Sequence, residues 1–260
     1  MSTVRNYTEI SPAKLSFEID DKGRIKTKYD GLQGLMVYAP PMVTINPCIN
    51  TECGKAWSDE KKAFVMEENG GFYTLDLTDL SAVDGQTNPA ADDFLKLLES
   101  LDAKFCEFVQ ANQAKLKVSP GRSLSKDQIS VLQTPSVRIK VDKETGQSFY
   151  KYLNMRIRTQ TMAGKRKTIP VVDSANYLIT DRAEIKTGDL VSTLVKIDTA
   201  YAIPEGKFGL KWSFLAIQQC KVGAFRFAGR TPELSFKAFD NEADFEPYLN
   251  PESVYTTAMQ

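Results

Sequence analysis

The stretch EIKTGDLVSTLVKIDTAYAIPEGKFGLKWSFLAIQQCKV, residues 184–222, predicts the central structural feature of the chain. Two runs rich in β-branched and aromatic residues, at 190–200 and 210–222, flank a connection with one proline and two glycines, which is typical of a β-hairpin. Alternation divides the second run into two faces, and we expect the more aromatic face to line the core. That face consists of Leu210, Trp212, Phe214 and Ala216, and the opposite face of Lys211, Ser213, Leu215 and Ile217.

The overall composition is that of an ordinary globular protein. The chain has 260 residues, of which 42% are hydrophobic and 25% are charged. No apolar run reaches the roughly 18–20 residues of a membrane span, and residues 1–15 lack the apolar segment of a signal peptide. We therefore expect a protein that is not secreted and has no membrane partner. Its expected location is the cytoplasm or nucleus, or a viral replication compartment if the source is viral.

Residue types that serve most enzymes and metal sites are scarce. The chain contains no histidine and no glycine-rich phosphate-binding loop. Its four cysteines lie at spacings unlike those of zinc sites: Cys48, Cys53, Cys106 and Cys220. We expect buried free thiols, no metal, no cofactor and no catalytic residue, so the main hypothesis is a protein that is not an enzyme. Lys28-Tyr29-Asp30-Gly31 offers one alternative, because it matches the short K-x-D-G motif of covalent nucleotidyltransferases.

A net charge of zero hides an uneven distribution of charge. Residues 231–260 carry six acidic residues and one lysine, a net charge of −5, which leaves +5 on residues 1–230. Residues 137–168 alone contain nine bases and two acids, a net charge of +7. A basic body with an acidic tail is typical of proteins that bind polyanions.

Several further patterns predict strands. Alternating residues predict a hairpin over 15–19 and 24–28, and a strand over 35–45 that is broken by a proline pair. Another hairpin is expected over residues 63–66 and 72–77, because Asn69-Gly70 between them is a strong turn sequence.

One long helix interrupts the strands, over about residues 89–117. Asn88 and Pro89 suit its first positions, and an apolar stripe at helical spacing follows. The stripe consists of Phe94, Leu97, Leu98, Leu101, Phe105, Phe108 and Val109. We expect an all-β-rich fold with α+β insertions, organised as one domain over residues 1–230 and an acidic C-terminal tail over residues 231–260.

A basic hairpin over residues 137–141 and 148–159 carries most of the candidate binding residues. Because side chains alternate along a strand, we expect its solvent face to combine cations with tyrosines. Cations neutralise phosphates and aromatic rings stack on bases, so this face suits a single-stranded nucleic acid. A basic loop over residues 161–168 is placed to close over a bound strand. The candidates are Arg138, Lys140, Tyr150, Tyr152, Arg156 and Arg158 in the hairpin, and Lys165, Arg166 and Lys167 in the loop.

The closing hairpin also resembles that of a known family. The turn at Gly188, the long strand ending at Tyr201 and the sequence GLKWSFLAIQ over residues 209–218 are similar to the closing hairpin of one group of oligonucleotide-binding (OB) barrels. These barrels belong to single-stranded-DNA-binding proteins of phages and large DNA viruses. The resemblance implies an OB-fold β-barrel with an inserted long helix and peripheral hairpins. It also implies a nucleic-acid-binding role for Tyr201 and a core position for Trp212 and Phe214.

The acidic tail is similar to the tails with which such proteins recruit replication proteins. The residues to which the resemblance assigns this partner-binding role are Asp244, Phe245, Glu246 and Tyr248. The alternative is an ordinary acidic extension without a partner.

Together these features predict a protein that coats and protects single-stranded DNA, independently of sequence, during DNA replication, recombination and repair. One alternative is an RNA-binding or transcription-associated OB module, because stacking and phosphate contacts do not distinguish the two sugars. Another is a structural virion protein whose basic hairpin contacts an acidic partner. A solvated hairpin face without a ligand is the simplest alternative, and a homo-oligomer is compatible with all of these.

Overall fold

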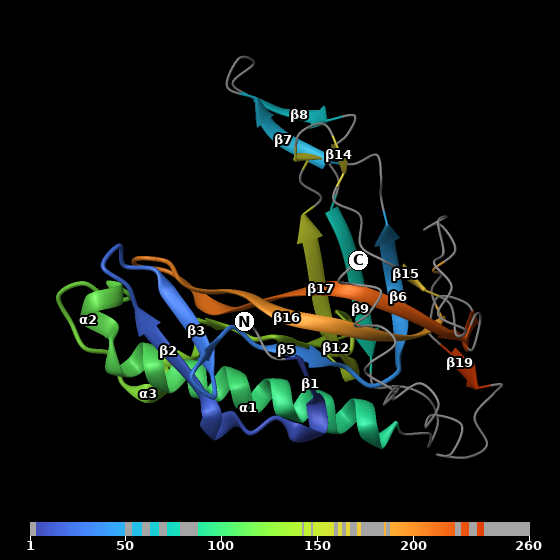
Figure 1. Cartoon of the computed structure of the whole chain (residues 1–260), viewed down its shortest axis with the longest axis horizontal. Coiled ribbons are helices and arrows are strands. Elements are labelled where there is room, and N and C mark those ends of the chain that lie inside the picture. The colour runs from blue at the N-terminus through green and yellow to red at the C-terminus, as the bar shows by residue number, and fades with distance from the viewer. Residues whose placement is uncertain are drawn as a thin grey trace.

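In the computed structural model the chain folds around one large sheet and one long helix (Figure 1). The structure describes the backbone of residues 4–49, 54–58, 63–67, 72–78, 88–141, 143–146, 148–158, 161–162, 165–166, 171–172, 185, 188–221, 225–228 and 233–236. It describes the side chains of residues 4–45, 75–78, 88–141, 143–146, 148, 151–153, 185 and 188–220. Within the described residues, no helix combines the length and the apolar character that a membrane span needs.

Nine strands precede the long helix in the described part of the chain. They are β1 (Val4–Asn6), β2 (Leu15–Ile19), β3 (Ile25–Tyr29), β4 (Leu32–Gln33), β5 (Met36–Tyr38), β6 (Met42–Ile49), β7 (Gly54–Ser58), β8 (Ala63–Glu67) and β9 (Phe72–Thr78). The helical elements are η1 (Tyr7–Glu9), η2 (Pro12–Lys14), α1 (Pro89–Ala111), α2 (Gln113–Leu116) and α3 (Lys126–Ser130). The later strands are β10 (Gln133–Thr134), β11 (Val137–Val141), β12 (Ser148–Arg158), β13 (Thr161–Met162), β14 (Lys165–Arg166), β15 (Val171–Val172), β16 (Leu190–Ala202), β17 (Phe208–Lys221), β18 (Phe225–Ala228) and β19 (Glu233–Phe236).

The predicted closing hairpin forms as β16 and β17 and is the centre of a 13-stranded sheet. One edge of β16 pairs with β17, and the other pairs in turn with β3, β5 and β6. From β6 the sheet continues through β9 and β12 to β11. β17 also pairs in parallel with β10 and β15.

The two ends of this sheet meet because β10 and β11 are consecutive in the chain. β10 pairs with β17 and β11 pairs with β12, with only Pro135 and Ser136 between them. Proline has no N–H group, so the ladder is interrupted there. Trp212 Nε1 donates a hydrogen bond to Ser136 Oγ at 2.8 Å across the junction. We call this junction of β10, β11 and β17 the seam. The fold is thus a strand-rich, rolled sheet with an inserted helix, as the sequence predicts, and side chains rather than a continuous ladder join its ends.

The inserted helix α1 lies along one side of the rolled sheet, below β2, β5 and β16 in Figure 1. Asn88 caps it by accepting a hydrogen bond from the Ala91 N–H at 3.2 Å. The apolar stripe faces the sheet, and the ring of Phe105 lies 4.8 Å from that of Phe17 and 5.9 Å from that of Phe208, between ring centroids. Burial of one such side chain stabilises the fold by about 2 kcal/mol. The predicted helix is confirmed, although the structure divides it into α1 and α2.

The hairpin predicted around Asn69-Gly70 is wrong. β8 pairs with β7, and β9 pairs with β6 and β12 in the large sheet. Leu75 and Leu77 of β9 explain the difference, because both are buried in the core cluster that contains the α1 stripe. Their burial outweighs the local preference for a two-strand turn. The predicted pairing of β2 with β3 is confirmed, and the proline pair lies between β5 and β6.

The predicted inner face of the closing hairpin is correct for the first part of β17 and wrong for the second. The confirmed core residues are Leu210, Trp212 and Phe214. Beyond them the ladder skips Leu215, which forms a bulge. A bulge reverses the alternation of side chains. Ala216 therefore lies in a separate small cluster with Leu194, and Ile217 lies in the main core instead.

Candidate nucleic-acid interface

The predicted basic hairpin forms as β11 and β12. The register places Arg138 opposite Tyr152, and opposed residues of an antiparallel pair lie on the same face. Arg138 and Lys140 are exposed and Tyr152 is half-buried. Val137 and Leu153, which oppose each other at the adjacent position, are buried in the core. The predicted division into a solvent face and a core face therefore holds for these residues, but not for Ile139 and Val141, which alternation places with Val137 and which are exposed.

A hollow of about 330 Å³ at the seam brings together candidates that are distant in sequence. Arg138 of β11 and Tyr201 of β16 both line it, and so does Lys211 of β17. We call it the seam pocket; its lining is Thr134, Pro135, Ser136, Arg138, Tyr201, Leu210, Lys211 and Trp212. Two cations beside a tyrosine and a partly apolar lining are suited to a phosphate and the face of an unpaired base.

Buried hydrogen bonds hold the seam in place. Ser136 donates twice to the carboxylate of Asp102 on α1, from its N–H to Oδ2 at 2.6 Å and from its hydroxyl to Oδ1 at 2.7 Å. The same hydroxyl oxygen accepts the bond from the Trp212 indole, and Gln133 Nε2 donates to the main-chain oxygen of Asp102 at 2.7 Å. Burial raises the pKa of Asp102 to about 6, although the hydrogen bonds from Ser136 act in the opposite direction. Ser136 of the seam therefore joins α1, through Asp102, to the closing hairpin, through Trp212.

Gly209 permits the close packing beside the seam pocket. It lies opposite Tyr201 in the hairpin register and pairs with Thr134 of β10 on its other side. A Cβ atom at this position would lie 2.6 Å from the Thr134 carbonyl oxygen and 3.2 Å from the Tyr201 hydroxyl oxygen. Only glycine allows β10 and the tyrosine side chain to approach the strand so closely.

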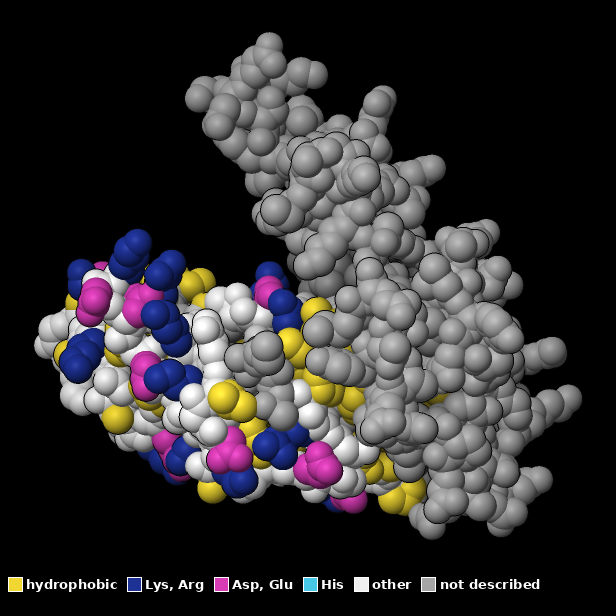
Figure 2. Space-filling model, in the orientation of Figure 1, with side chains coloured by type: hydrophobic (Ala, Val, Ile, Leu, Met, Phe, Trp, Pro, Cys, Tyr) yellow, Lys and Arg dark blue, Asp and Glu magenta, His cyan; other side chains and the backbone are white. Residues whose placement is uncertain are grey.

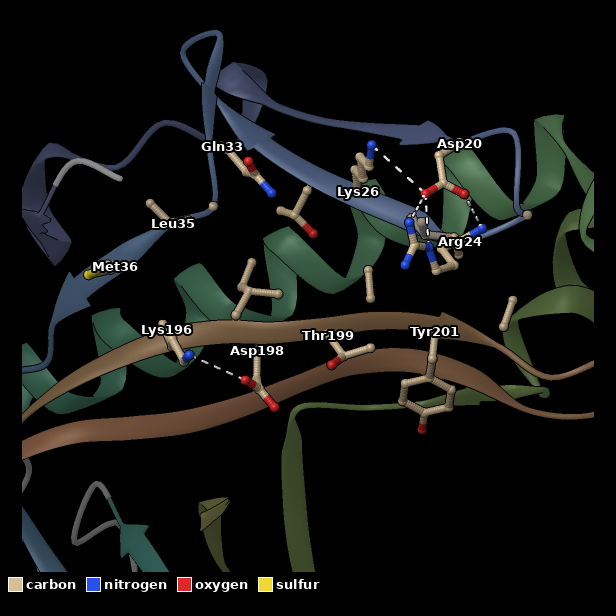
Figure 3. Close-up of a pocket in the computed structure, with 17 residues that line it drawn as sticks. Asp20, Arg24, Lys26, Gln33, Leu35, Met36, Lys196, Asp198, Thr199 and Tyr201 are labelled. Atoms are coloured by element: carbon tan, nitrogen blue, oxygen red, sulfur yellow. Dashed lines mark hydrogen bonds and ion pairs between the residues drawn. The ribbon is translucent and has the colours of Figure 1, made fainter. Parts of the chain in front are cut away.

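A second, larger hollow of about 710 Å³ lies at the edge of β16 that faces away from β17, between this strand and β3 and β5 (Figure 3). We call it the β3–β16 hollow. Its cations are Arg24, Lys26 and Lys196. Asp20 lies 2.8 Å from Arg24 Nη2 and 3.8 Å from Lys26 Nζ, measured from its Oδ2. The hydrogen bond from the Arg24 backbone N–H, followed by that from its side chain, lowers the pKa of Asp20.

Two residues of β16 connect the two hollows. Tyr201 lines both, and Figure 3 shows its ring directed away from Asp20 and Arg24 and across the second strand of the hairpin. Asp198 lies between lysines of the two hollows, 3.4 Å from Lys196 Nζ and 3.9 Å from Lys211 Nζ. Figure 2 shows Lys and Arg side chains, with Asp and Glu among them, gathered over the end of the molecule formed by β2, β3 and the turn between β16 and β17.

The structure describes only the backbone at several other candidates. Arg156 and Arg158 pair in register with Thr74 and Phe72 of β9, and β14 pairs with β13 within the basic loop. The candidates whose side chains lie outside the described residues are Tyr150, Arg156, Arg158, Lys165 and Arg166. Those that lie wholly outside them are Lys167, Asp244, Phe245, Glu246 and Tyr248.

Lysines of the hollows are the residues that sequence reasoning missed. Lys211 alternates with the core residues Leu210 and Trp212, so its outward position was predictable, but its place beside Arg138 was not. Lys26 and Lys196 come together only through the pairing of β3 and β5 with β16, which no local pattern indicates.

Three residues with side chains of a reactive type, two cysteines and one lysine, are buried or form an ion pair. Cys106 and Cys220 are buried free thiols as predicted, and burial raises the pKa of Cys220 to about 12. The side chain of Cys48 and the whole of Cys53 lie outside the described residues. Lys28 of the K-x-D-G sequence lies on β3, where its Nζ contacts Glu18 Oε1 at 2.6 Å.

No protein-family model matches the sequence, and no curated protein matches it. Among solved structures, the chain is similar to gp2.5, a single-stranded DNA binding protein encoded by bacteriophage T7, at 16% identity and a TM-score of 0.38 over 76% of this chain and 97% of that one. It is also similar to the single-stranded DNA-binding protein from bacteriophage Enc34 in complex with ssDNA, at 14% identity and a TM-score of 0.39 over 80% of this chain and 96% of that one. A C-terminal truncation of the Enc34 protein matches at 15% identity and a TM-score of 0.38 over 81% of this chain and 97% of that one. Likenesses of this degree do not establish a shared ligand, which has to be inferred from the chain's own residues.

Proposed function

We propose that this chain binds single-stranded DNA without sequence preference and performs no chemical step on it. The observation that supports this most directly is the seam pocket, where Arg138, Lys211 and Tyr201 converge on a partly apolar hollow. Exposed Lys140 and half-buried Tyr152 continue the same combination of cation and ring along the neighbouring hairpin.

The chemistry of these side chains favours an unpaired strand. Arginine and lysine neutralise phosphates whatever the base, and a tyrosine ring stacks on any base face. Stacking requires a base that has left its duplex, so the ring favours single strands over duplexes. The proposal includes coating and protection of such strands during replication, recombination and repair, with residues 231–260 docking replication proteins.

Binding of a labelled oligothymidylate, followed by fluorescence anisotropy over a series of salt concentrations, tests the proposal. The Arg138→Ala/Lys140→Ala variant removes two exposed cations, so its fold is expected to stay intact. Each lost phosphate contact lowers the slope of log affinity against log salt by about 0.7, so the slope should fall by about 1.4.

The matched control is Lys115→Ala/Lys126→Ala, which removes two exposed lysines from α2 and α3. Its affinity should stay within about twofold of the parent, because screening weakens the effect of distant charges. A parent protein that fails to bind at low salt would reject the function, and an Arg138→Ala/Lys140→Ala variant that binds normally would reject this surface. Tighter binding of matched RNA would replace DNA by RNA as the ligand.

A further inference from the structure

The β3–β16 hollow opens because the neighbours of β16 diverge. β16 pairs with β5 as far as Lys196, opposite Met36, and with β3 only at Ala200, opposite Ile25. Between these two points the sheet separates, and the larger hollow lies in the gap. The β16–β17 hairpin is therefore a ridge between two hollows, one along the edge of β16 beside β3 and β5 and the other at the seam beyond β17.

The chemical character of the larger hollow matches that of the seam pocket. Lys26 and Lys196 line it together with the partly exposed apolar residues Ile25 and Met36, and Tyr201 belongs to both hollows. The two lysines are partly exposed, at 48% and 33% of their side-chain surfaces, so their charges are accessible to a ligand. Cations, apolar surface and a tyrosine recur on both sides of the β16–β17 hairpin.

We infer that the β3–β16 hollow is a second nucleotide subsite, and that a bound strand crosses the β16–β17 hairpin at Tyr201 from one hollow to the other. This inference rests on the proposed function and specifies the path of the strand. Phosphates in the second subsite contact Lys26 and Lys196, and the backbone that crosses the ridge passes Asp198.

Asp198 acts on this path as an internal competitor of the ligand. Its carboxylate contacts Lys196 of one hollow and Lys211 of the other, so a crossing phosphate has to replace it at both lysines. A carboxylate beside the crossing point also repels the strand directly. Asp198 thereby weakens binding and keeps the strand exchangeable.

Oligothymidylates of about 4 and about 12 nucleotides separate the two subsites, because they span the range of lengths bound by one oligonucleotide-binding fold. The test variant is Lys26→Gln/Lys196→Gln. Its matched control is Lys14→Gln/Lys28→Gln, which removes two partly exposed lysines that also form ion pairs, from η2 and β3, but leaves the hollow unchanged. Circular dichroism and thermal melting verify that each variant is folded.

The test variant is expected to bind the longer oligomer about tenfold more weakly, with a salt slope lower by about 1.4, and to bind the shorter one almost as the parent does. The control should bind both as the parent does. Unchanged affinity of the test variant for the longer oligomer, in a parent that binds both, would overturn the second subsite while leaving the proposed function intact. Equal losses for both lengths would also overturn it, because they indicate a general field effect. A parent that binds neither oligomer would reject the proposed function and this inference together.

Asp198→Asn tests the competitor separately. Removing a like charge about 5 Å from a phosphate in water corresponds to a gain of about fourfold in affinity for the longer oligomer at low salt. The gain should fade as salt rises. Unchanged or weaker binding by a folded Asp198→Asn protein would overturn the competing role of this carboxylate.

Discussion

Replacing Asp102 by Asn is expected to remove a pH dependence of stability that originates at the seam. Asp102 is buried on α1, and its carboxylate receives both hydrogen bonds from Ser136. Burial is the main cause that raises its pKa to about 6, from an ordinary value of 3.8, and the negative charge of Glu99 adds to it. Asn has the same shape but does not titrate, so the two proteins differ in this proton equilibrium.

The sign follows from the protons bound by each state. Between pH 3.8 and about 6 the folded protein keeps the Asp102 proton while the unfolded chain has lost it. The folded state is therefore stabilised as pH falls through about 6, and the gain levels off below 3.8. The two pKa values correspond to a full difference of about 3 kcal/mol, of which about 2 kcal/mol is present at pH 4. At pH 7 the group makes almost no such contribution.

Urea unfolding followed by circular dichroism, at constant ionic strength and several pH values between 4 and 7, measures this effect. The free energy of unfolding of the parent minus that of Asp102→Asn should rise by about 2 kcal/mol from pH 7 to pH 4. Other carboxylates cancel in the difference. At pH 7 the variant should also be less stable by about 1–3 kcal/mol, because an amide cannot accept both bonds from Ser136. A difference that stays flat over this pH range would refute the assignment of a raised pKa to this buried carboxylate.

Two other predictions concern single residues. Gly209→Ala should destabilise the protein by about 1–3 kcal/mol in thermal melts, because its Cβ would press on the Thr134 carbonyl oxygen, which belongs to the backbone. Gly206→Ala is its matched control and should be nearly neutral. The atom closest to its added Cβ, at 3.2 Å, is Cγ2 of Ile203, whose exposed side chain can move. Equal losses of stability in the two variants would contradict this reasoning. Cys220 should resist alkylation in the native protein at pH 8, because burial raises its pKa to about 12. Peptide mapping after alkylation with and without denaturant measures this, and rapid labelling of the native protein would contradict it.

Local patterns predicted the elements of the fold better than their pairing. The cap at Asn88 and the apolar stripe of α1 are encoded within a few residues, and so is the closing hairpin, whose long strands flank a short connection. Asn69-Gly70 was an equally strong local pattern, but the pairing of β9 depends on burial against residues far along the chain. The bulge at Leu215 likewise depends on the register between β17 and β16, which shifts between Leu194 and Val195. Nothing in the alternation of residues along β17 itself predicts it.

The candidate site shows the same division between local and distant information. Alternation correctly placed Arg138 outward on its strand, because the buried Val137 beside it was visible in sequence. A family resemblance indicates Tyr201, and only the fold shows that it lines the same pocket as Arg138. No sequence pattern indicates Lys211 or Lys196 as a binding residue, because their value as ligands for phosphate comes from neighbours supplied by other strands.

The position of Ser136 links the inserted helix to the direction in which the cations point. Its N–H and hydroxyl both bind Asp102 of α1, so the backbone is fixed at the residue where β10 gives way to β11. The next residue, Val137, lies in the core, and Arg138 after it is exposed. A slip of one residue would press the guanidinium against α1 and expose the valine, and an unpaired buried charge costs several kcal/mol. The helix between β9 and β11 therefore does more than fill the rolled sheet: through one serine it sets the register that keeps the cations of β11 available to a polyanion.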